Sequence, residues 1–368
     1  MKILFTFLTY GINTFGGVEK SIYNLIQGLI KINVEAVVFT GNMCKKSNDT
    51  NHKIYYSDYL INDFNVSDIN NDIIQNYTTY NAQIKEELLD IIEKEKPDYI
   101  LAIDHIWGII PHIDIFSDTT CPIGMVFHML HEENLINKSL NYPFTHMFCV
   151  SNYVKNGVKR LDSKNSEFIL LPNCISNEYF MQNKELGQMN IFCNARIAEG
   201  KGVQHLIDAF LKLLNLYPQC KLYLCNGDFH FMEKIDINKQ IEGINKYLHE
   251  EKIVLLPNLK WNAISEILHQ MDIVILPTEM ETFGLGALET IASRIPLITT
   301  PVGNLPDLLE DSAFFIDMIT SEKIVEAIIN VFTERKTTFK KTEKGYQIAK
   351  NYLDTNVASV LVNHLFDC

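Results

Sequence analysis

The sequence predicts an α/β protein of two domains, each built on a parallel β-sheet flanked by helices. Its 368 residues are enough for two hydrophobic cores of ordinary size. Apolar runs of strand length alternate with helical patterns along most of the chain, as they do in βαβ units. A polar, poorly periodic segment at 177–189 separates two such series. We therefore expect one domain over residues 1–183 and a second over 184–350.

The first series starts with an apolar run at residues 2–8. This run faintly resembles a secretory signal, but no small-residue cleavage site follows, so it is predicted to be a strand. Residues 41–80 are rich in Asn and Asp and are expected to have little regular structure. The remaining strands are expected at 34–39, 99–103, 123–127, 147–150 and 168–171, and the helices at 18–31, 80–96 and 152–160.

The second series begins at Asn190 and repeats the alternation of strand, loop and helix. Its strands are expected at 191–195, 222–225, 253–256, 273–276 and 297–300. Helical periodicity predicts helices at 203–216, 236–248, 321–333 and 344–366, and the last of these is either continuous or broken. A further helix is expected to start at 285 and to be stopped by Arg294-Ile295-Pro296.

Charge and composition exclude several classes of protein. The formal net charge of −13 and the pI of about 5.3 argue against a nucleic-acid partner, and no basic patch suggests docking on anionic lipid. No stretch approaches the roughly 18 uninterrupted apolar residues of a transmembrane helix. The eight cysteines lack the paired spacing of metal sites. They are predicted to be reduced core residues of a cytoplasmic protein.

The stretch from Ile273 to Gly303 carries the main candidate site. Glu281 and Glu289, with seven residues between them, flank a Phe-Gly-Leu-Gly turn at 283–286 that starts a helix. Such a turn presents backbone N–H groups that suit an anion. Glu289 lies one turn into the helix, where it can bind a ribose diol, and Glu281 lies on the other side of the anion. The pattern fits a diphosphate between two sugars, which is a nucleotide sugar. The alternative is that both acids are solvated surface residues.

Two further loops suit phosphate groups. Arg196 and Lys201 place two cations in one loop after a predicted strand, as a phosphate clamp requires. Gly16-Gly17 precedes the first predicted helix, although a glycine pair alone is usually only a turn. A dinucleotide fold needs G-x-G-x-x-G here and an acid after the second strand, where this chain has Thr40. NAD binding is therefore disfavoured.

Histidines follow two predicted strands of the first domain, at the edge where parallel sheets bind ligands. His105 is expected to be a satisfied surface residue. His128 and His131 have a spacing that allows a pair of metal ligands, but no third ligand is evident. We therefore expect no metal site.

Together these motifs resemble those of the retaining GT-B glycosyltransferases of glycosyltransferase family 4, also called glycosyl transferases group 1. The resemblance covers nearly the whole chain. It rests on Gly16-Gly17, His128, Pro172-Asn173, Arg196 with Lys201, and the E-x7-E motif of Glu281 and Glu289 with Phe283-Gly284 inside it. The chain departs from the family pattern at Ala195, at Cys174 and Ser176, and after Cys225. These departures affect loop shape and nucleotide preference more than activity.

The resemblance implies the GT-B fold, in which two Rossmann-like domains face each other across a cleft. Residues 1–183 would bind the acceptor, 184–350 the nucleotide sugar, and a helix at about 351–368 would cross back to the first domain. The implied reaction moves a hexosyl unit, with retention, from a nucleotide diphosphate sugar (UDP favoured) to a hydroxyl of a glycan, a lipid-linked or a small-molecule acceptor. It needs no divalent metal or other cofactor, and the chain has no Asp-x-Asp motif.

The resemblance also implies roles for residues. Arg196 and Lys201 would stabilise the leaving diphosphate, helped by N–H groups of Gly284, Leu285, Gly16 and Gly17. Glu289 would hold the ribose, and Glu281 and His128 would contact the donor sugar, with Phe283 also in the donor site. The catalytic set is therefore expected to be His128, Arg196, Lys201 and Glu281.

Two other functions are compatible with this architecture. A nucleotide-sugar 2-epimerase would use the same donor, but its usual acid and histidine set is not apparent. A catalytically degenerate partner subunit would keep the fold alone, and the presence of Arg196, Lys201, Glu281 and Glu289 argues against it. Nothing in the segments 41–80 and 105–145 specifies an acceptor.

Overall fold

A computed structural model describes residues 1–11, 16–41, 51–60, 69–182, 185–195, 197, 200–225, 247, 250–256 and 261–366. The chain divides into two compact units. The first unit comprises Met1–Cys174 together with Asp354–Cys368, and the second comprises Ile175–Leu353.

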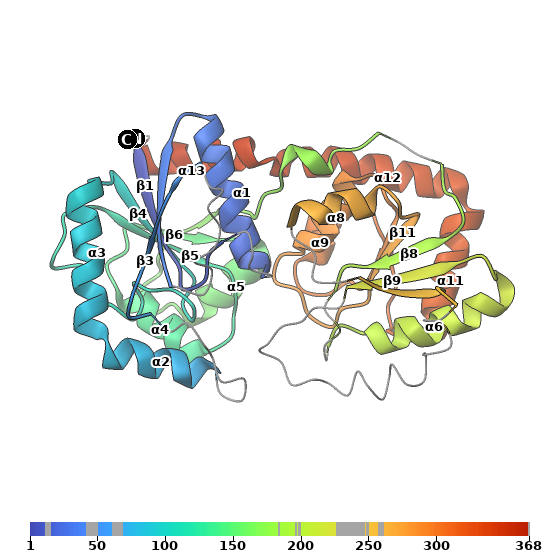
Figure 1. Ribbon diagram of the computed structural model, residues 1–368, viewed down its shortest axis with the longest axis horizontal. Helices are drawn as coiled ribbons and strands as arrows, with labels where there is room; N and C mark the ends of the chain where they lie inside the picture. Colours follow the sequence, from blue (N-terminus) through green and yellow to red (C-terminus); the bar gives the residue numbers. More distant parts are fainter. Residues whose placement is uncertain are drawn as a thin grey trace. The chain divides into compact units, whose positions relative to one another are not determined.

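The described part of the first unit contains a seven-stranded, wholly parallel sheet in the order β3-β2-β1-β4-β5-β6-β7 (Figure 1). Apolar side chains line these strands on both faces because helices cover a parallel sheet on both sides. Its strands are β1 (Lys2–Thr6), β2 (Glu35–Thr40), β3 (Lys53–Tyr56), β4 (Tyr99–Ile103), β5 (Ile123–Phe127), β6 (His146–Cys149) and β7 (Phe168–Leu170).

The helices of the first unit include one from the C-terminus of the chain. They are α1 (Gly17–Lys31), α2 (Ile69–Thr79), α3 (Asn81–Glu95), α4 (Glu133–Asn141), α5 (Asn152–Leu161) and α13 (Asp354–Phe366). Helices α1 and α13 lie side by side (Figure 1). A Cβ at Gly28 would lie only 2.2 Å from the Asp354 carbonyl oxygen, and Lys31 pairs with the buried Asp354 carboxylate. Glycine at position 28 therefore permits the close packing of the two helices.

The second unit repeats the same strand order. Its described strands are β8 (Asn190–Cys193), β9 (Lys221–Cys225), β10 (Ile253–Leu256), β11 (Ile273–Leu276), β12 (Leu297–Thr299) and β13 (Phe314–Phe315). They form a parallel sheet in the order β10-β9-β8-β11-β12-β13. Counted along each unit, both sheets follow the order 3-2-1-4-5-6 of Rossmann folds. The prediction of two Rossmann-like α/β domains is confirmed.

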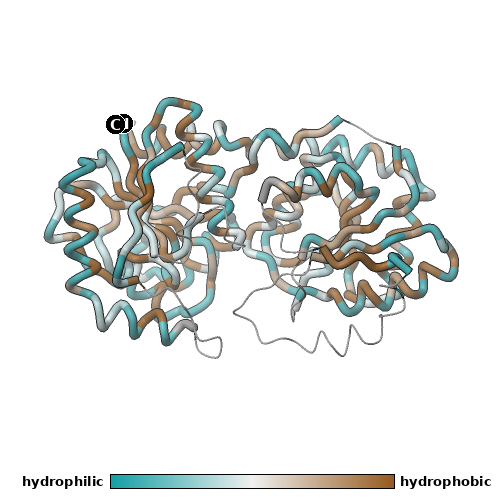
Figure 2. Tube along the Cα trace, in the orientation of Figure 1, coloured by the Kyte–Doolittle hydropathy of each residue, from teal (hydrophilic) through white to brown (hydrophobic). Residues whose placement is uncertain are grey.

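Apolar faces of α6 and α11 cover one side of the second sheet, where the strands form the most hydrophobic part of the unit (Figure 2). The helical segments described in this unit are η2 (Asn177–Tyr179), α6 (Val203–Leu216), α8 (Trp261–Leu268), α9 (Leu285–Ala292), α10 (Leu305–Leu309), α11 (Ser321–Thr333), α12 (Arg335–Ala349) and η3 (Lys350–Tyr352). The helix expected at 236–248 falls almost wholly outside the described residues.

The units divide at Cys174–Ile175 rather than at residue 183, which itself lies outside the described residues. The division lies there because Ile175 forms a parallel bridge with Leu353, so the predicted linker starts inside the second unit. The terminal helix is broken into α12 and α13 by η3, and the returning segment, expected at about 351–368, begins at Asp354.

The expectation of little regular structure at 41–80 is wrong for two of its parts. Strand β3 forms there because it pairs with β2 along the edge of the sheet, and α2 follows. Helices α4, α8 and α10 and the short strand β13 were not predicted either.

Of the described cysteines, Cys149, Cys174, Cys193 and Cys220 are buried thiols, whereas Cys121 and Cys225 are partly exposed. None of the described helices has the length and apolar character needed to cross a membrane.

Candidate functional site

In a Rossmann fold, ligands bind outside the carboxyl ends of the strands, where the strand order reverses. In the second unit this point lies between β8 and β11. The loop after β8 carries Lys201, and the loop after β11 carries Glu281. The two loops are joined by a hydrogen bond from the Glu279 N–H to the Gly200 carbonyl oxygen at 2.8 Å.

Gly202 allows these loops to approach so closely. Its φ of +60° lies in the left-handed region, and a Cβ there would lie 2.1 Å from the Pro277 carbonyl oxygen. Any other residue at position 202 would force the loops apart. The glycine after the predicted clamp lysine therefore sets the distance between the two loops.

Lys201 and Glu281 are brought together by this packing. The Lys201 ammonium lies 3.8 Å from Glu281 Oε2, 3.2 Å from the Thr278 hydroxyl and 3.4 Å from the Met280 carbonyl oxygen. The side chains of Lys201 and Glu281 keep 27% and 29% of their exposure. A cation and a carboxylate are thus both accessible to a ligand at the edge of the sheet.

Helix α9 starts beside these residues at Gly284, whose φ is +101°. No described side chain caps this helix start, so the N–H groups of its first turn, including that of Leu285, are available to an anion. Phe283 is only 3% exposed, and its ring packs edge-on against Tyr352 with the centroids 6.0 Å apart. Phe283 can therefore contribute backbone groups to a ligand, while its ring belongs to the core.

Glu289 is 2% exposed, so the alternative of a solvated surface acid is wrong for this residue. Its Oε2 lies 3.5 Å from the amide nitrogen of Asn194, the residue that follows β8. The oxygen of the same amide accepts a hydrogen bond from the Cys225 thiol at 3.6 Å, which fixes the orientation of the amide. Burial, with a contribution from Glu289, raises the pKa of the Tyr179 phenol well above its usual value.

Gly303 and Asn304 were not singled out in the sequence, yet they fix the loop that carries Glu281. A Cβ at Gly303, where φ is +57°, would lie 1.8 Å from the Glu281 carbonyl oxygen. Asn304 donates its backbone N–H to that oxygen at 3.1 Å and its side-chain amide to the Phe283 carbonyl oxygen at 3.0 Å. An asparagine before the Leu-Pro start of α10 suggests only a helix cap from sequence. In the structure its side chain reaches back to the Phe283 loop instead.

Arg196, the second cation of the predicted clamp, lies outside the described residues. Its role in the clamp therefore stays a prediction.

The first unit holds the other predicted residues. Gly16 and Gly17 stand at the start of α1, as expected from the sequence. The Glu19 carboxylate folds back over Gly16, where an added Cβ would lie 1.8 Å from it, and it accepts a hydrogen bond from the Thr9 hydroxyl at 2.7 Å. A glutamate at the third helical position that reaches back to the helix start is a capping arrangement. An anion bound at this glycine loop would have to share it with Glu19.

His128 follows β5 and is 4% exposed. Burial lowers the pKa of its imidazole to about 4, so the ring is neutral at physiological pH. His105 is fully buried, and the expectation of a surface histidine is wrong. The isoleucines of the segment that follows it, residues 106–115, are all buried as well. Its Nδ1 lies 3.1 Å from Asp104 Oδ1.

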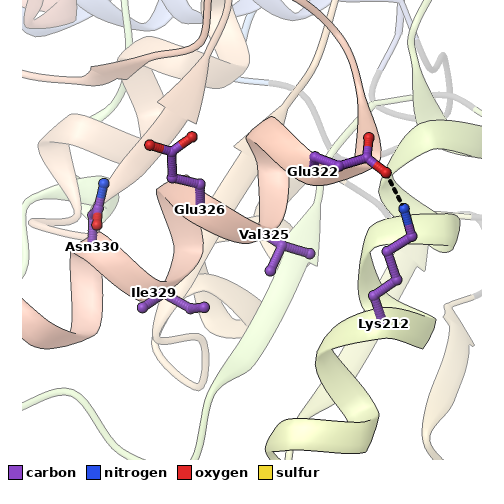
Figure 3. A pocket seen from close by; sticks show the side chains of 6 residues that line it. All are labelled: Lys212, Glu322, Val325, Glu326, Ile329 and Asn330. Carbon is purple, nitrogen blue, oxygen red and sulfur yellow. Dashed lines mark hydrogen bonds and ion pairs between the residues drawn. The ribbon is translucent and has the colours of Figure 1, made fainter.

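No cluster of three or more metal-ligating side chains with the geometry of an ion site occurs among the described residues. A hollow of about 420 Å³ on α6 and α11 is lined by Lys212, Glu322, Val325, Glu326, Ile329 and Asn330 (Figure 3). Lys212 is paired with Glu322, and Val325 and Ile329 contribute apolar side chains to the lining (Figure 3). None of the predicted site residues lines it, so it is not a candidate for the reaction.

Residues 176–350, nearly all of the second unit, match the family model of glycosyl transferases group 1. This unit belongs to that family. The match spans the loops of Lys201, Glu281 and Glu289.

Among relatives of this chain, the phosphatidylinositol N-acetylglucosaminyltransferase gpi3 subunit of Schizosaccharomyces pombe is 21% identical over 58% of the chain and 47% of the relative. The chain thus aligns with about half the length of that protein. The N-acetyl-alpha-D-glucosaminyl L-malate synthase of Bacillus anthracis is 21% identical over 77% of the chain and 76% of the relative.

A solved structure of Anabaena HepE in complex with UDP and glucose superimposes with a TM-score of 0.76 at 14% identity. The superposition covers 100% of each chain. At this identity the likeness concerns the fold alone, and it assigns both units of the chain to the GT-B architecture.

Proposed function

We propose that the protein transfers a hexosyl unit, with retention, from a nucleotide diphosphate sugar to a hydroxyl group of an acceptor. The observation that carries this proposal is the approach of Lys201 Nζ to within 3.8 Å of Glu281 Oε2, beside the uncapped start of α9. A cation and a helix start suit a diphosphate, and a carboxylate next to them suits the hydroxyls of a sugar.

In this reaction the bond between the anomeric carbon and the diphosphate breaks, and negative charge grows on the leaving oxygens. Lys201 and Arg196 stabilise that charge, with the N–H groups of Gly284 and Leu285 and of the Gly16-Gly17 loop. The acceptor hydroxyl attacks from the side of the leaving group, and the departing phosphate takes its proton. No protein nucleophile and no divalent metal are required.

The two acids, Glu281 and Glu289, bind the two sugars of the donor. Glu281 is accessible and orients the donor sugar through its hydroxyls. Glu289 is buried and in contact with Asn194. It holds the ribose diol by exchanging that contact for contacts with the nucleotide. His128 lines the donor sugar as a neutral ring that can both donate and accept a hydrogen bond.

UDP is the favoured nucleotide of this proposal. Anabaena HepE, which shares the fold, was solved with UDP and glucose. The acceptor is a glycan, a lipid-linked saccharide or a small molecule, and the protein acts in the cytoplasm without nucleic-acid partners.

The first experiment is thermal melting of the full chain with UDP, GDP, ADP and their sugars. A ligand that binds the native state at 100 times its Kd stabilises it by about 2.7 kcal/mol, which is a rise of several degrees for a chain of this size. The nucleotide that raises the Tm is then used to measure donor hydrolysis and transfer. A chelator should leave the turnover unchanged, and loss of activity restored by Mn²⁺ would contradict the metal-free mechanism.

Lys201→Ala is the matching variant, with Lys212→Ala as its control, because Lys212 is a half-exposed lysine paired with Glu322 away from the site. We expect Lys201→Ala to lower turnover by about 100-fold or more, while Lys212→Ala keeps it. Near-normal turnover in Lys201→Ala would refute the clamp. No Tm rise with any nucleotide would favour a degenerate partner subunit, and release of a free epimerised sugar would favour an epimerase.

A further inference from the structure

The loop after β8 places an amide donor next to the buried carboxylate of α9. The amide belongs to Asn194, the first residue after β8, and the carboxylate belongs to Glu289. Asn194 Nδ2 lies 3.5 Å from Glu289 Oε2. Glu289 is 2% exposed, whereas Asn194 is only partly buried. The pair therefore extends from the interior of the second unit to the edge of the sheet where Rossmann folds bind ligands.

The orientation of the Asn194 amide is fixed from its other side. The register of β8 with β9 pairs Cys193 with Leu224. The next residues of the chain, Asn194 and Cys225, are therefore neighbours, and the Cys225 thiol donates to Asn194 Oδ1 at 3.6 Å. A reversed amide would turn its oxygen toward the carboxylate, and both groups can only accept when the acid is ionised. The amide nitrogen is therefore the atom that points to Glu289.

The contact between this nitrogen and Glu289 is one that a ligand can improve. A distance of 3.5 Å is long, because a good N–H···O hydrogen bond measures about 2.7–3.2 Å. The two atoms are still close enough for a single oxygen to lie about 2.8–3.0 Å from both. A hydroxyl at that point would donate to the carboxylate and accept from the amide. The pair is thus complementary to a hydroxyl group, for which a carboxylate alone offers only the acceptor.

The pair lies beside the helix start that suits the diphosphate. A Cβ at Gly286, in the first turn of α9, would lie 3.7 Å from Asn194 Nδ2. Glu289 follows three residues after Gly286, which is about one turn of the helix. The ribose of a nucleotide is joined directly to its phosphates. A diphosphate bound at the helix start therefore brings the ribose to this turn of α9.

We propose that Asn194 is a second binding residue for the ribose, and that its amide donates to the same hydroxyl that donates to Glu289. This inference rests on the proposed function, in which Glu289 holds the ribose diol. Asn194 then determines specificity, because it favours nucleotides that carry this hydroxyl over those that lack it. Cys225 is a positioning residue, since its thiol holds the amide in the orientation that donates.

The test is calorimetric titration of the full chain with UDP, 2′-deoxy-UDP and 3′-deoxy-UDP. In the wild type, the analogue without the shared hydroxyl lacks two hydrogen bonds, one of them to a charged group. It should bind about 100-fold more weakly than UDP. In Asn194→Ala, UDP should bind about tenfold more weakly, and the affinity for that analogue should stay as it is in the wild type. The preference for UDP should therefore fall to about tenfold.

A second background separates a direct contact from an effect on the carboxylate. In Glu289→Ala, a preference of about tenfold for UDP should remain, because Asn194 still donates to the hydroxyl. Adding Asn194→Ala should abolish that preference. If Asn194 only oriented Glu289, Glu289→Ala would already show no preference. If Asn194 only stabilised the loop, Asn194→Ala would weaken UDP and both analogues by the same factor.

Two other positions supply the controls. Asn190, at the opposite end of β8, donates its side-chain amide to the Gln270 carbonyl oxygen at 3.1 Å, and Asn190→Ala should leave all three affinities unchanged. Cys225→Ser keeps an O–H donor for Asn194 and should keep the preference for UDP. Cys225→Ala removes that donor and should lower the preference.

An unchanged preference in Asn194→Ala, or no preference in the wild type, would overturn the inference even if sugar transfer is found. If the preferences follow the expectation but no sugar is transferred, the proposed reaction fails and the ribose contact stands. The deoxy forms of GDP or ADP are used if one of these nucleotides is the one that raises the Tm, and binding of none of the three would overturn both proposals. Asn194→Ser replaces Asn194→Ala should the latter fail to fold, because its side chain is too short to place a donor at the position of the amide nitrogen.

Discussion

Asn304→Ala tests whether the hydrogen bond from the Asn304 side chain stabilises the loop that carries Glu281. The Asn304 side chain is 5% exposed, and its amide donates to the Phe283 carbonyl oxygen at 3.0 Å. The substitution removes this donor and leaves the buried Phe283 carbonyl group without its hydrogen bond from the amide, which lowers the free energy of unfolding by about 1–3 kcal/mol. The Asn304 backbone N–H, which bonds the Glu281 carbonyl oxygen, is retained. The Glu281 loop is thus loosened without being detached.

For a unit of roughly 180 residues, a loss of about 2 kcal/mol lowers the Tm by about 4–8 °C. The same loosening should weaken nucleotide-sugar binding, because Glu281 and the start of α9 must be in place together. If about 1.4 kcal/mol of the loss falls on the bound state, the Kd rises tenfold. Melting by scanning calorimetry and titration with the nucleotide that stabilises the wild type measure the two effects separately.

Ser312→Ala is the matched control. Ser312 is 2% exposed, and its hydroxyl donates to the Leu309 carbonyl oxygen at 2.6 Å, at the end of α10. It should lower the Tm by a comparable amount and leave the Kd unchanged. Equal Kd values for Asn304→Ala and the wild type, with the Tm lowered, would refute the claim that Asn304 orders the donor loop. An unchanged Tm would refute the hydrogen bond itself.

Two further predictions concern the first unit. Gly17→Ala should leave the Tm unchanged or slightly raised, because an added Cβ meets no atom within 4 Å and alanine favours the helix. The same substitution should weaken nucleotide-sugar binding. An unchanged Kd would remove Gly17 from the donor site. Acid should destabilise the fold between pH 6.5 and 4, because burial lowers the pKa of His112 and His128 to about 4. In this range the histidines bind protons in the unfolded chain but not in the folded one. Their contribution to the free energy of unfolding is therefore complete above about pH 6.5, and for each ring about 1.4 kcal/mol of it is lost by pH 5.5. Urea unfolding at pH 7 and 5.5 should show a pH dependence smaller by that amount in His112→Gln, and an unaltered dependence would contradict a neutral buried His112.

Local pattern was enough to predict most of the strands and the paired acids. Glu281 and Glu289 were predictable because the glycine turn and the helix that separate them are contiguous in sequence. Strand β3 was not, because its four residues lie within a polar, poorly periodic segment and are recognised as a strand only through their pairing with β2. Short helices such as α10 gave too little periodicity to be recognised.

The supporting residues were missed for a different reason. Asn304 follows the strand after α9, and its link to Phe283 depends on how the chain returns, which no local pattern records. His105 was expected at the surface because histidine after a strand usually is solvated. The signal that could have corrected this is the isoleucine-rich segment at 106–115, whose isoleucines are all buried.

The two units share a strand order and differ in the charges that they place at the switch point. In the second unit Lys201 and Glu281 are both more than a quarter exposed, so each can exchange its partner for a ligand. In the first unit Asp104 and His105 are wholly buried, with His105 Nδ1 3.1 Å from Asp104 Oδ1, so neither is accessible to a ligand. Charge that must meet a diphosphate has to be accessible, whereas two buried charges act on each other strongly because water screens them least. The same fold thus supports an accessible pair in one unit and a buried pair in the other.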